Sequence, residues 1–274
     1  MDTILVPVDN GEASKNAIVY AAKLAKDLGK SIILINAYQV PISYTEVPLV
    51  TMSLAQIEEA SRELLENYKT EIQNITDTEI KIYVESVYGE IENEIKKIIE
   101  KINPYLIIIG TAGRSGLGKF FLGSTSLKII NDTKTPVLII PPELKYKRFQ
   151  TIGLTTDFED VIEITSTKVI GELVRKYKST LSVIHVDYER YHFTANTPME
   201  TMDLDNILSG LNPTYHYIEN KDIIEGIITY VTENDVDLLV VYPKKHNWFE
   251  KIFQKSSTRV LIQTAIKPIL CLRN

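Results

Sequence analysis

The chain repeats one alternating pattern of strands and helices, and this repeat limits the folds that it can adopt. Thr151 to Asp157 matches Thr3 to Asp9 at an offset of 148 positions, with an aspartate after the apolar strand in both copies. From the third helix onward the offset is 132 without a gap, so that Pro268 matches Pro136. The 274 residues therefore hold two copies of one unit, of which the second is 16 residues shorter.

Short β-branched runs alternate with longer runs of helical period in the first copy. Strands that are apolar along their whole length, such as Leu106 to Ile109, need cover on both faces, as in a parallel sheet between helices. We therefore predict an α/β fold, with a five-stranded parallel sheet flanked by helices in each copy. The predicted strands are 3–8, 31–35, 80–87, 105–109 and 137–140, and the predicted helices are 13–28, 52–73, 91–102 and 124–131.

A polar stretch that begins with two prolines, Pro141 to Arg148, separates the copies and is typical of a linker. We predict one domain over residues 1–142 and a second over 149–274. The segment around 204–208 is expected to be a reduced version of the long helix at 52–73.

Each copy ends in an apolar strand, 137–140 and 269–272, whose edge needs to be covered. Pairing of the two repeats as a pseudo-twofold pair within the chain would cover both edges. Pairing of like repeats between two chains of a homodimer would do the same. The sequence leaves both arrangements open.

Composition excludes several classes of function. With 30 Lys and Arg against 36 Asp and Glu, the net charge of -6 gives no attraction to nucleic acid or to anionic membranes. Cys271 is the only cysteine, which excludes an intramolecular disulfide and a cysteine zinc site and fits a reducing, cytoplasmic setting. The four histidines lack the spacing of a metal site. The first residues have the pattern of a strand and not of a signal peptide, and no apolar run approaches the roughly 20 residues that cross a bilayer.

The segment after the fourth strand carries the clearest chemical signal. It contains Gly110, Gly113 and Gly123, followed by Ser124 and Thr125 at the start of a helix. Glycine lets backbone N–H groups approach an anion, and hydroxyls at a helix N-terminus add donors. The pattern predicts a phosphate cradle, although a glycine loop with an ordinary serine cap is the simpler alternative.

Two familiar phosphate motifs do not fit these residues. A P-loop would need Ser or Thr at the position of Phe120. A dinucleotide fingerprint would need its glycines in the first strand–helix turn, which reads Pro7-Val8-Asp9-Asn10-Gly11. The spacing that does fit is G-x2-G-x9-G-(S/T).

This spacing, together with the Val-Pro-Val-Asp opening and the Thr-Pro-Val-Leu-Ile-Ile close of the first copy, resembles the universal stress protein family in its tandem two-domain form. The resemblance implies Rossmann-like domains of the adenine nucleotide alpha hydrolase type, with the nucleotide across the carboxyl ends of the strands. It assigns adenine and ribose contacts to Pro7, Asp9 and the region of Ala37, and ribose and phosphate contacts to Gly110, Gly113, Gly123, Ser124 and Thr125.

The resemblance implies that ATP or AMP is the ligand, with Mg²⁺ as a counterion, and that the protein is a stress-response sensor or regulator. A carboxylate such as Asp9 can accept hydrogen bonds from ribose hydroxyls or from the adenine amino group, while its alternative role is to cap a helix. No water-activating base or arginine finger is identifiable, so binding is better supported than hydrolysis. A slow ATPase and a protein–protein adaptor with a vestigial nucleotide site are the alternatives.

The second copy has lost every glycine of the motif. At the offset of 132, Tyr242 stands in place of Gly110 and Lys255 in place of Gly123. Bulky side chains obstruct the close approach of phosphate to the backbone. We therefore expect the second copy to serve in pairing, in regulation or in binding another ligand.

Overall fold

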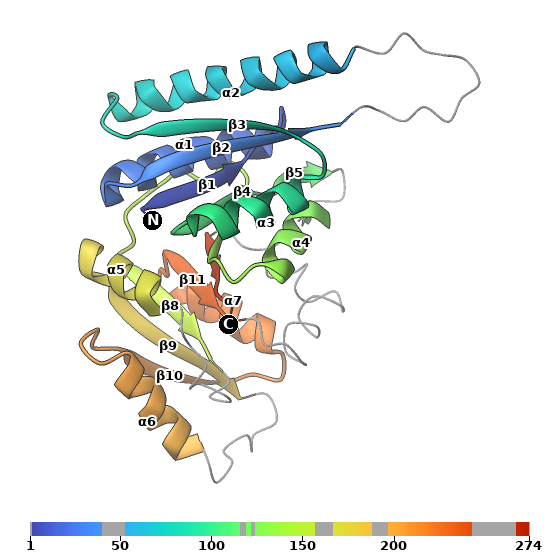
Figure 1. Cartoon of the computed structure of the whole chain (residues 1–274). Helices are drawn as coiled ribbons and strands as arrows, with labels where there is room; N and C mark the ends of the chain where they lie inside the picture. Colours follow the sequence, from blue (N-terminus) through green and yellow to red (C-terminus); the bar gives the residue numbers. More distant parts are fainter. Residues whose placement is uncertain are drawn as a thin grey trace. The chain divides into compact units, whose positions relative to one another are not determined.

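The computed structural model describes residues 2–39, 53–115, 119–121, 124–156, 167–187, 197–242 and 267–273 (Figure 1). The chain forms two compact units. Unit 1 consists of Met1–Gly110 and Gly123–Thr135, and unit 2 consists of Thr111–Leu122 and Pro136–Asn274.

Unit 1 contains a parallel sheet with the strand order β4-β1-β2-β3. β1 and β4 each bury four consecutive residues, as strands do when both faces are covered, whereas the edge strand β3 is only half-buried. Helices α1 and α2 pack against each other, and so do α3 and α4. The elements are β1 (Thr3–Pro7), α1 (Glu12–Leu28), β2 (Ser31–Tyr38), α2 (Leu54–Thr76), β3 (Ile82–Tyr88), α3 (Ile91–Ile102), β4 (Leu106–Gly110) and α4 (Ser124–Asp132).

Local signals explain where the two long helices of unit 1 begin and end. α2 starts with a capping box, in which the Ser53 hydroxyl accepts from the Gln56 N–H and the Gln56 side chain accepts from the Ser53 N–H. α1 ends at Gly29, whose φ of 66° lies in the left-handed region that glycine adopts without strain. This ending lets β2 follow after two residues.

Unit 2 contains five parallel strands in the order β10-β9-β8-β11-β12, with β7 antiparallel beside β12. The sequence predicts a reduced version of α2 around 204–208, and the short helix α6 (Thr197–Ile207) confirms this prediction. A hairpin of β5 and β6, which the sequence does not predict, occupies part of the glycine segment. The elements are β5 (Ala112–Ser115), β6 (Lys119–Phe121), β7 (Val137–Ile140), β8 (Thr151–Thr155), α5 (Thr167–Tyr177), β9 (Thr180–Asp187), α6 (Thr197–Ile207), β10 (Thr214–Glu219), α7 (Ile223–Glu233), β11 (Leu238–Val241) and β12 (Ile269–Cys271).

The hydrogen bonds of the two copies confirm the repeat and the predicted α/β fold class. In each copy, a backbone N–H just beyond the first strand bonds to the second strand, and the residue before the fourth strand bonds to the start of the first. The bonds are Val8 N to Ile35 O (2.9 Å) and Thr156 N to Ile184 O (3.0 Å), then Tyr105 N to Thr3 O and Asp237 N to Thr151 O (both 2.8 Å).

The last strands of the two copies, β7 and β12, pair with each other. Val137 lies opposite Cys271 and Ile139 lies opposite Ile269, and the residues of both strands are buried. This is the strand contact expected for pairing within the chain. Because β7 belongs to unit 2, the two units do not coincide with the predicted domains. The domain limits 1–142 and 149–274 therefore stay a prediction from the sequence.

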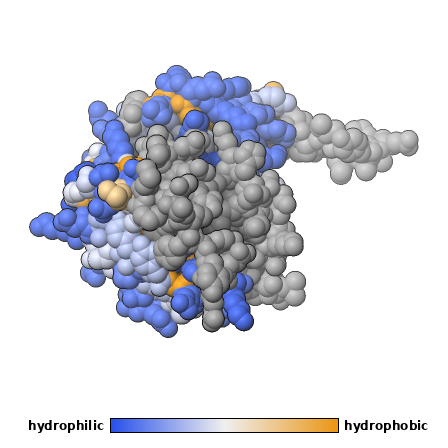
Figure 2. Space-filling view, turned by 90° about the horizontal axis from the view of Figure 1, so that it is seen from below, coloured by the Kyte–Doolittle hydropathy of each residue, from blue (hydrophilic) through white to orange (hydrophobic). Residues whose placement is uncertain are grey.

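The described surface is largely hydrophilic, with small hydrophobic spots in the view of Figure 2. Among the described residues, no helix is long and apolar enough to span a membrane.

A buried carboxylate, that of Asp237, binds the predicted linker to the rest of unit 2. Asp237, only 4% exposed, accepts from the Gln150 N–H at 2.7 Å and the Thr151 N–H at 3.2 Å, and pairs with the Lys147 ammonium. Burial opposes ionisation, but Lys147 and the two N–H groups outweigh it and hold the pKa of Asp237 below its ordinary value. Asp237 therefore stabilises the fold in its charged form.

We predict that Asp237→Asn lowers the free energy of unfolding by about 1–3 kcal/mol at neutral pH, because it removes charge-assisted bonds from a buried site. Since the folded-state pKa is lowered, this contribution is complete above the ordinary aspartate pKa of about 4 and is lost as the pH falls below it. Urea unfolding at pH 7 and pH 3 should show a difference from wild type that shrinks in acid. The exposed neighbour Asp235→Asn is the control, and an equal effect of both variants would contradict the prediction.

Candidate functional site

Three separate segments of the chain meet at one edge of the sheet in unit 1. Pro7 ends β1, Ala37 is the penultimate residue of β2, and Gly110 ends β4. β1 pairs in parallel with both β2 and β4, so the carboxyl ends of all three strands lie at the same edge. Open α/β sheets generally bind ligands there.

Asp9 follows β1 at this edge, where its carboxylate shapes the turn into α1. Asp9 Oδ1 accepts from the Gly11 N–H at 2.8 Å and from the Ser14 hydroxyl at 2.7 Å, and the Asp9 N–H donates to Ser14 Oγ at 2.9 Å. The helix cap itself is Gly11, so Asp9 forms a turn ahead of the cap. Within the part of the chain that the structure describes, the hydrogen bonds to this exposed carboxylate all go to Oδ1, which leaves Oδ2 open to a donor.

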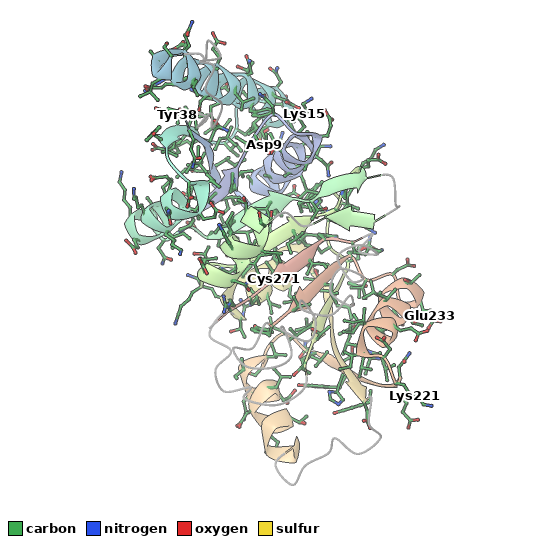
Figure 3. All side chains as sticks on the ribbon, turned by 90° about the vertical axis from the view of Figure 1, so that its right-hand side faces the viewer. Asp9, Lys15, Tyr38, Lys221, Glu233 and Cys271 are labelled. Atoms are coloured by element: carbon green, nitrogen blue, oxygen red, sulfur yellow. The ribbon has the colours of Figure 1, made fainter. Side chains whose placement is uncertain are left out.

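Helix α2 contributes two polar side chains to this region, one bonded to Asp9 itself and one connected to Val8 through Asn36, and sequence analysis missed both. The Tyr68 hydroxyl donates to Asp9 O at 2.9 Å. The Ser61 hydroxyl donates to Asn36 Oδ1 at 2.7 Å, and Asn36 Nδ2 donates to Val8 O at 2.7 Å. Figure 3 labels Asp9 and shows it in the region that α2 and α1 enclose.

A signal for these residues is present in the sequence. Ser61, Leu65, Tyr68 and Ile72 recur at helical spacing and form the buried face of α2. Buried polar side chains on this largely apolar face, which also includes Thr76, require hydrogen-bond partners.

Gly110 has a structural reason to be glycine in addition to the predicted approach of a ligand. A Cβ atom built at Gly110 would lie 2.1 Å from the carbonyl oxygen of Ala13, in the first turn of α1. The absence of a side chain therefore lets α1 pack directly on the end of β4.

Ser124 and Thr125 begin α4, as predicted, with Ser124 exposed at the helix N-terminus. The Thr125 hydroxyl donates to the carboxylate of Glu92 in α3, and Lys128 reaches the same carboxylate at 3.2 Å. The backbone N–H of Glu92 itself, then Lys128 and Thr125, hold the pKa of Glu92 below its ordinary value. A negative charge thus lies beside one of the predicted phosphate contacts.

The structure does not assemble all the predicted residues. Gly113 lies in β5, which belongs to unit 2, and Gly123 lies outside the described residues. In the second copy, Asp157 and Lys255 also lie outside them.

Tyr242, at the position that corresponds to Gly110, is described. Its hydroxyl is buried and has no hydrogen-bond partner among the residues that the structure describes, and burial raises its pKa. A large side chain therefore stands where the first copy has none.

Metal-binding chemistry finds no support in the described part of the chain. No group of three or more His, Cys, Asp or Glu side chains lies there in an arrangement that could hold a metal ion. His185 is buried, and its Nδ1 lies 3.0 Å from Thr156 O, the position that Asn36 Nδ2 takes toward Val8 O in the first copy. Cys271 is buried, and burial raises the pKa of its thiol to about 12.

Comparisons with known proteins agree with the fold. The model of the universal stress protein family matches residues 1–141. A universal stress protein of Methanocaldococcus jannaschii is 30% identical over 142 residues, which make up 50% of this chain and 80% of that protein. The crystal structure of a universal stress protein from Archaeoglobus fulgidus is similar over 99% of this chain and 98% of its own, with 19% identity and a TM-score of 0.75. Another universal stress protein, solved in complex with cAMP, matches 52% of this chain and 98% of its own at 17% identity and a TM-score of 0.38.

We predict that Gly110→Ala lowers the free energy of unfolding by about 1–3 kcal/mol, because the new methyl group overlaps the Ala13 carbonyl and α1 has to shift. Urea unfolding of the ligand-free protein measures this. Gly171→Ala is the control, since a Cβ there meets only the movable side chain of Arg175, and alanine favours the helix. Wild-type stability of Gly110→Ala would contradict the prediction.

Proposed function

Because the chain belongs to the universal stress protein family, we propose that its first copy binds ATP or a related adenine nucleotide such as AMP. In this proposal the protein acts as a stress-response sensor or regulator whose state depends on the bound nucleotide. Any Mg²⁺ would enter as the counterion of the phosphates.

The observation that carries the proposal is the position of the Asp9 carboxylate. It is exposed at the carboxyl edge of β1, β2 and β4, and Oδ1 is held by Gly11 and Ser14. A carboxylate fixed in this way directs Oδ2 toward a donor, and the ribose hydroxyls and the adenine amino group are such donors. Pro7 and Ala37, both half-buried at the same edge, would contact the flat apolar surface of the adenosine.

The phosphates would lie toward the N-terminus of α4. The exposed Ser124 hydroxyl, the first N–H groups of the helix and the helix dipole all favour an anion there. Lys128, one turn further along α4, supplies a positive charge that Glu92 partly neutralises. In this proposal, Gly113 and Gly123 admit the phosphates to the backbone.

The second copy is not proposed to bind a nucleotide in the same way. Tyr242 brings a half-buried side chain with a buried hydroxyl to the position that corresponds to Gly110, and lysine replaces the glycines at 113 and 123. Its role in pairing is supported by β12, which covers the edge of β7.

We expect small molecules released from the purified protein to include an adenine nucleotide, which mass spectrometry would identify. In calorimetric titration, Asp9→Ala should weaken the binding of ATP by about 1–3 kcal/mol, since it removes charge-assisted hydrogen bonds to the adenosine. Asp157→Ala, the same change at the matching position of the second copy, should leave the affinity unchanged. A folded Asp9→Ala variant with wild-type affinity, or a loss caused by Asp157→Ala, would refute this site.

We also predict that Glu92→Gln strengthens the binding of ATP, by roughly twofold to fivefold at low salt, because it removes a negative charge beside Thr125 and releases Lys128. The gain should shrink at high salt and should be absent for adenosine, which has no phosphate. Glu79→Gln is the control: Glu79 pairs with Lys26 at 3.0 Å just before β3, at the opposite edge of the sheet. Unchanged or weaker binding of ATP by Glu92→Gln would place the phosphates elsewhere.

A further inference from the structure

We infer that helix α2 positions the segment that contacts the nucleotide, and that Tyr68 is its principal positioning residue. This inference rests on the proposed function and assigns a role to a side chain that need not touch the ligand. The Tyr68 ring lies on the buried face of α2, 59 positions from Asp9 in the sequence.

The bond from Tyr68 acts on the residue that would hold the ribose. Its hydroxyl donates to the main-chain oxygen of Asp9 at 2.9 Å, while the side chain of Asp9 is held from the other side by Gly11 and Ser14. Fixing the carbonyl fixes the peptide plane and hence the direction of the carboxylate. Burial raises the pKa of Tyr68, so its hydroxyl stays protonated and remains a donor at physiological pH.

A second connection from α2 reaches the preceding residue. Val8 O accepts from Asn36, whose side-chain oxygen accepts from Ser61, and the Ser86 hydroxyl lies 2.7 Å from the Ser61 hydroxyl. This chain of bonds joins β1, β2, β3 and α2. Consecutive carbonyls of the segment, at Val8 and Asp9, are therefore both tied to the same helix.

The composition of the buried face of α2 supports this role. Apolar side chains such as Leu65 and Ile72 would be sufficient to bury the helix, and a buried hydroxyl costs free energy unless it is hydrogen-bonded. The two hydroxyl side chains that flank Leu65, Ser61 and Tyr68, bond to Asn36 and Asp9 O respectively. Thr76, the third polar residue of this face, bonds to Ile72 O within the helix. Tyr68 therefore serves the segment 7–9 directly, and Ser61 serves it through Asn36.

In the second copy the helix at this place is much shorter. Its counterpart of α2 is α6, with 11 residues against 23, and Asp205 of α6 accepts from Tyr215 of the edge strand β10. Nδ1 of His185 in β9 lies 3.0 Å from Thr156 O. The shorter helix thus occurs in the copy that has also lost the glycines.

The test measures the binding of ATP and of 2′,3′-dideoxy-ATP to the full-length protein by calorimetry. Tyr68→Phe keeps the buried ring and removes only the hydroxyl. We expect it to weaken ATP binding about fivefold to tenfold, the effect of one lost hydrogen bond, and to change the binding of dideoxy-ATP much less, since that ligand gives Asp9 no ribose hydroxyl to hold. In the Asp9→Ala background, Tyr68→Phe should cause no further loss.

Two variants separate positioning from general damage. Tyr83→Phe removes a hydroxyl from a tyrosine that is 47% exposed on β3 and should leave both affinities unchanged. Ser61→Ala should also weaken the binding of ATP more than the binding of dideoxy-ATP. If Tyr68→Phe fails to fold, Ser61→Ala replaces it as the test variant.

Wild-type affinity in folded Tyr68→Phe, or an equal loss for both ligands, would overturn the inference and leave the proposed function intact. Failure of the wild-type protein to bind any adenine nucleotide would overturn both.

Discussion

Parallel pairing of β1 with β2 and β4 is the constraint on which unit 1 depends. Strands that run in the same direction cannot be joined by tight turns, so the chain has to return through helices, and those helices cover both faces of the sheet. The same geometry brings Pro7, Ala37 and Gly110 to one edge although 30 and 73 positions separate them in the sequence. The candidate site is therefore a consequence of strand direction, and local side chains refine it.

Much of this architecture follows from the sequence, because burial on both faces makes strands such as Leu106–Gly110 recognisable as apolar runs. The helix Ile91–Ile102 and the strand Val137–Ile140 occur at the predicted positions. The β5–β6 hairpin was not predicted, since glycines and charged residues give no alternating pattern there. The hydrogen bonds of Tyr68 and Asn36 were missed for another reason. The helical spacing of Tyr68 shows that its hydroxyl needs a partner, but both side chains bond to main-chain oxygens, and the sequence does not indicate which of these acceptors is used.

The two copies share the arrangement of their strands and differ in the residues at the carboxyl ends of those strands. Asn36 and His185 occupy matching places and reach matching carbonyls, Val8 O and Thr156 O, by different chemistry. Gly110 and Tyr242 occupy matching places and differ in consequence, since Gly110 has no side chain and admits the backbone of α1, whereas Tyr242 places a half-buried side chain there. Two backbone hydrogen bonds at the ends of the first strand recur in both copies.

The antiparallel pairing of β7 with β12 has a consequence for how such a chain can diverge after duplication. A single copy with an uncovered apolar strand needs a second molecule to complete its sheet, so its assembly depends on concentration and both partners are under the same selection. Once the partner strand is part of the same polypeptide, completion becomes unimolecular, and the second copy is required only to supply that strand. The carboxyl edge of its strands is then free to accumulate residues that a self-pairing protein could not tolerate.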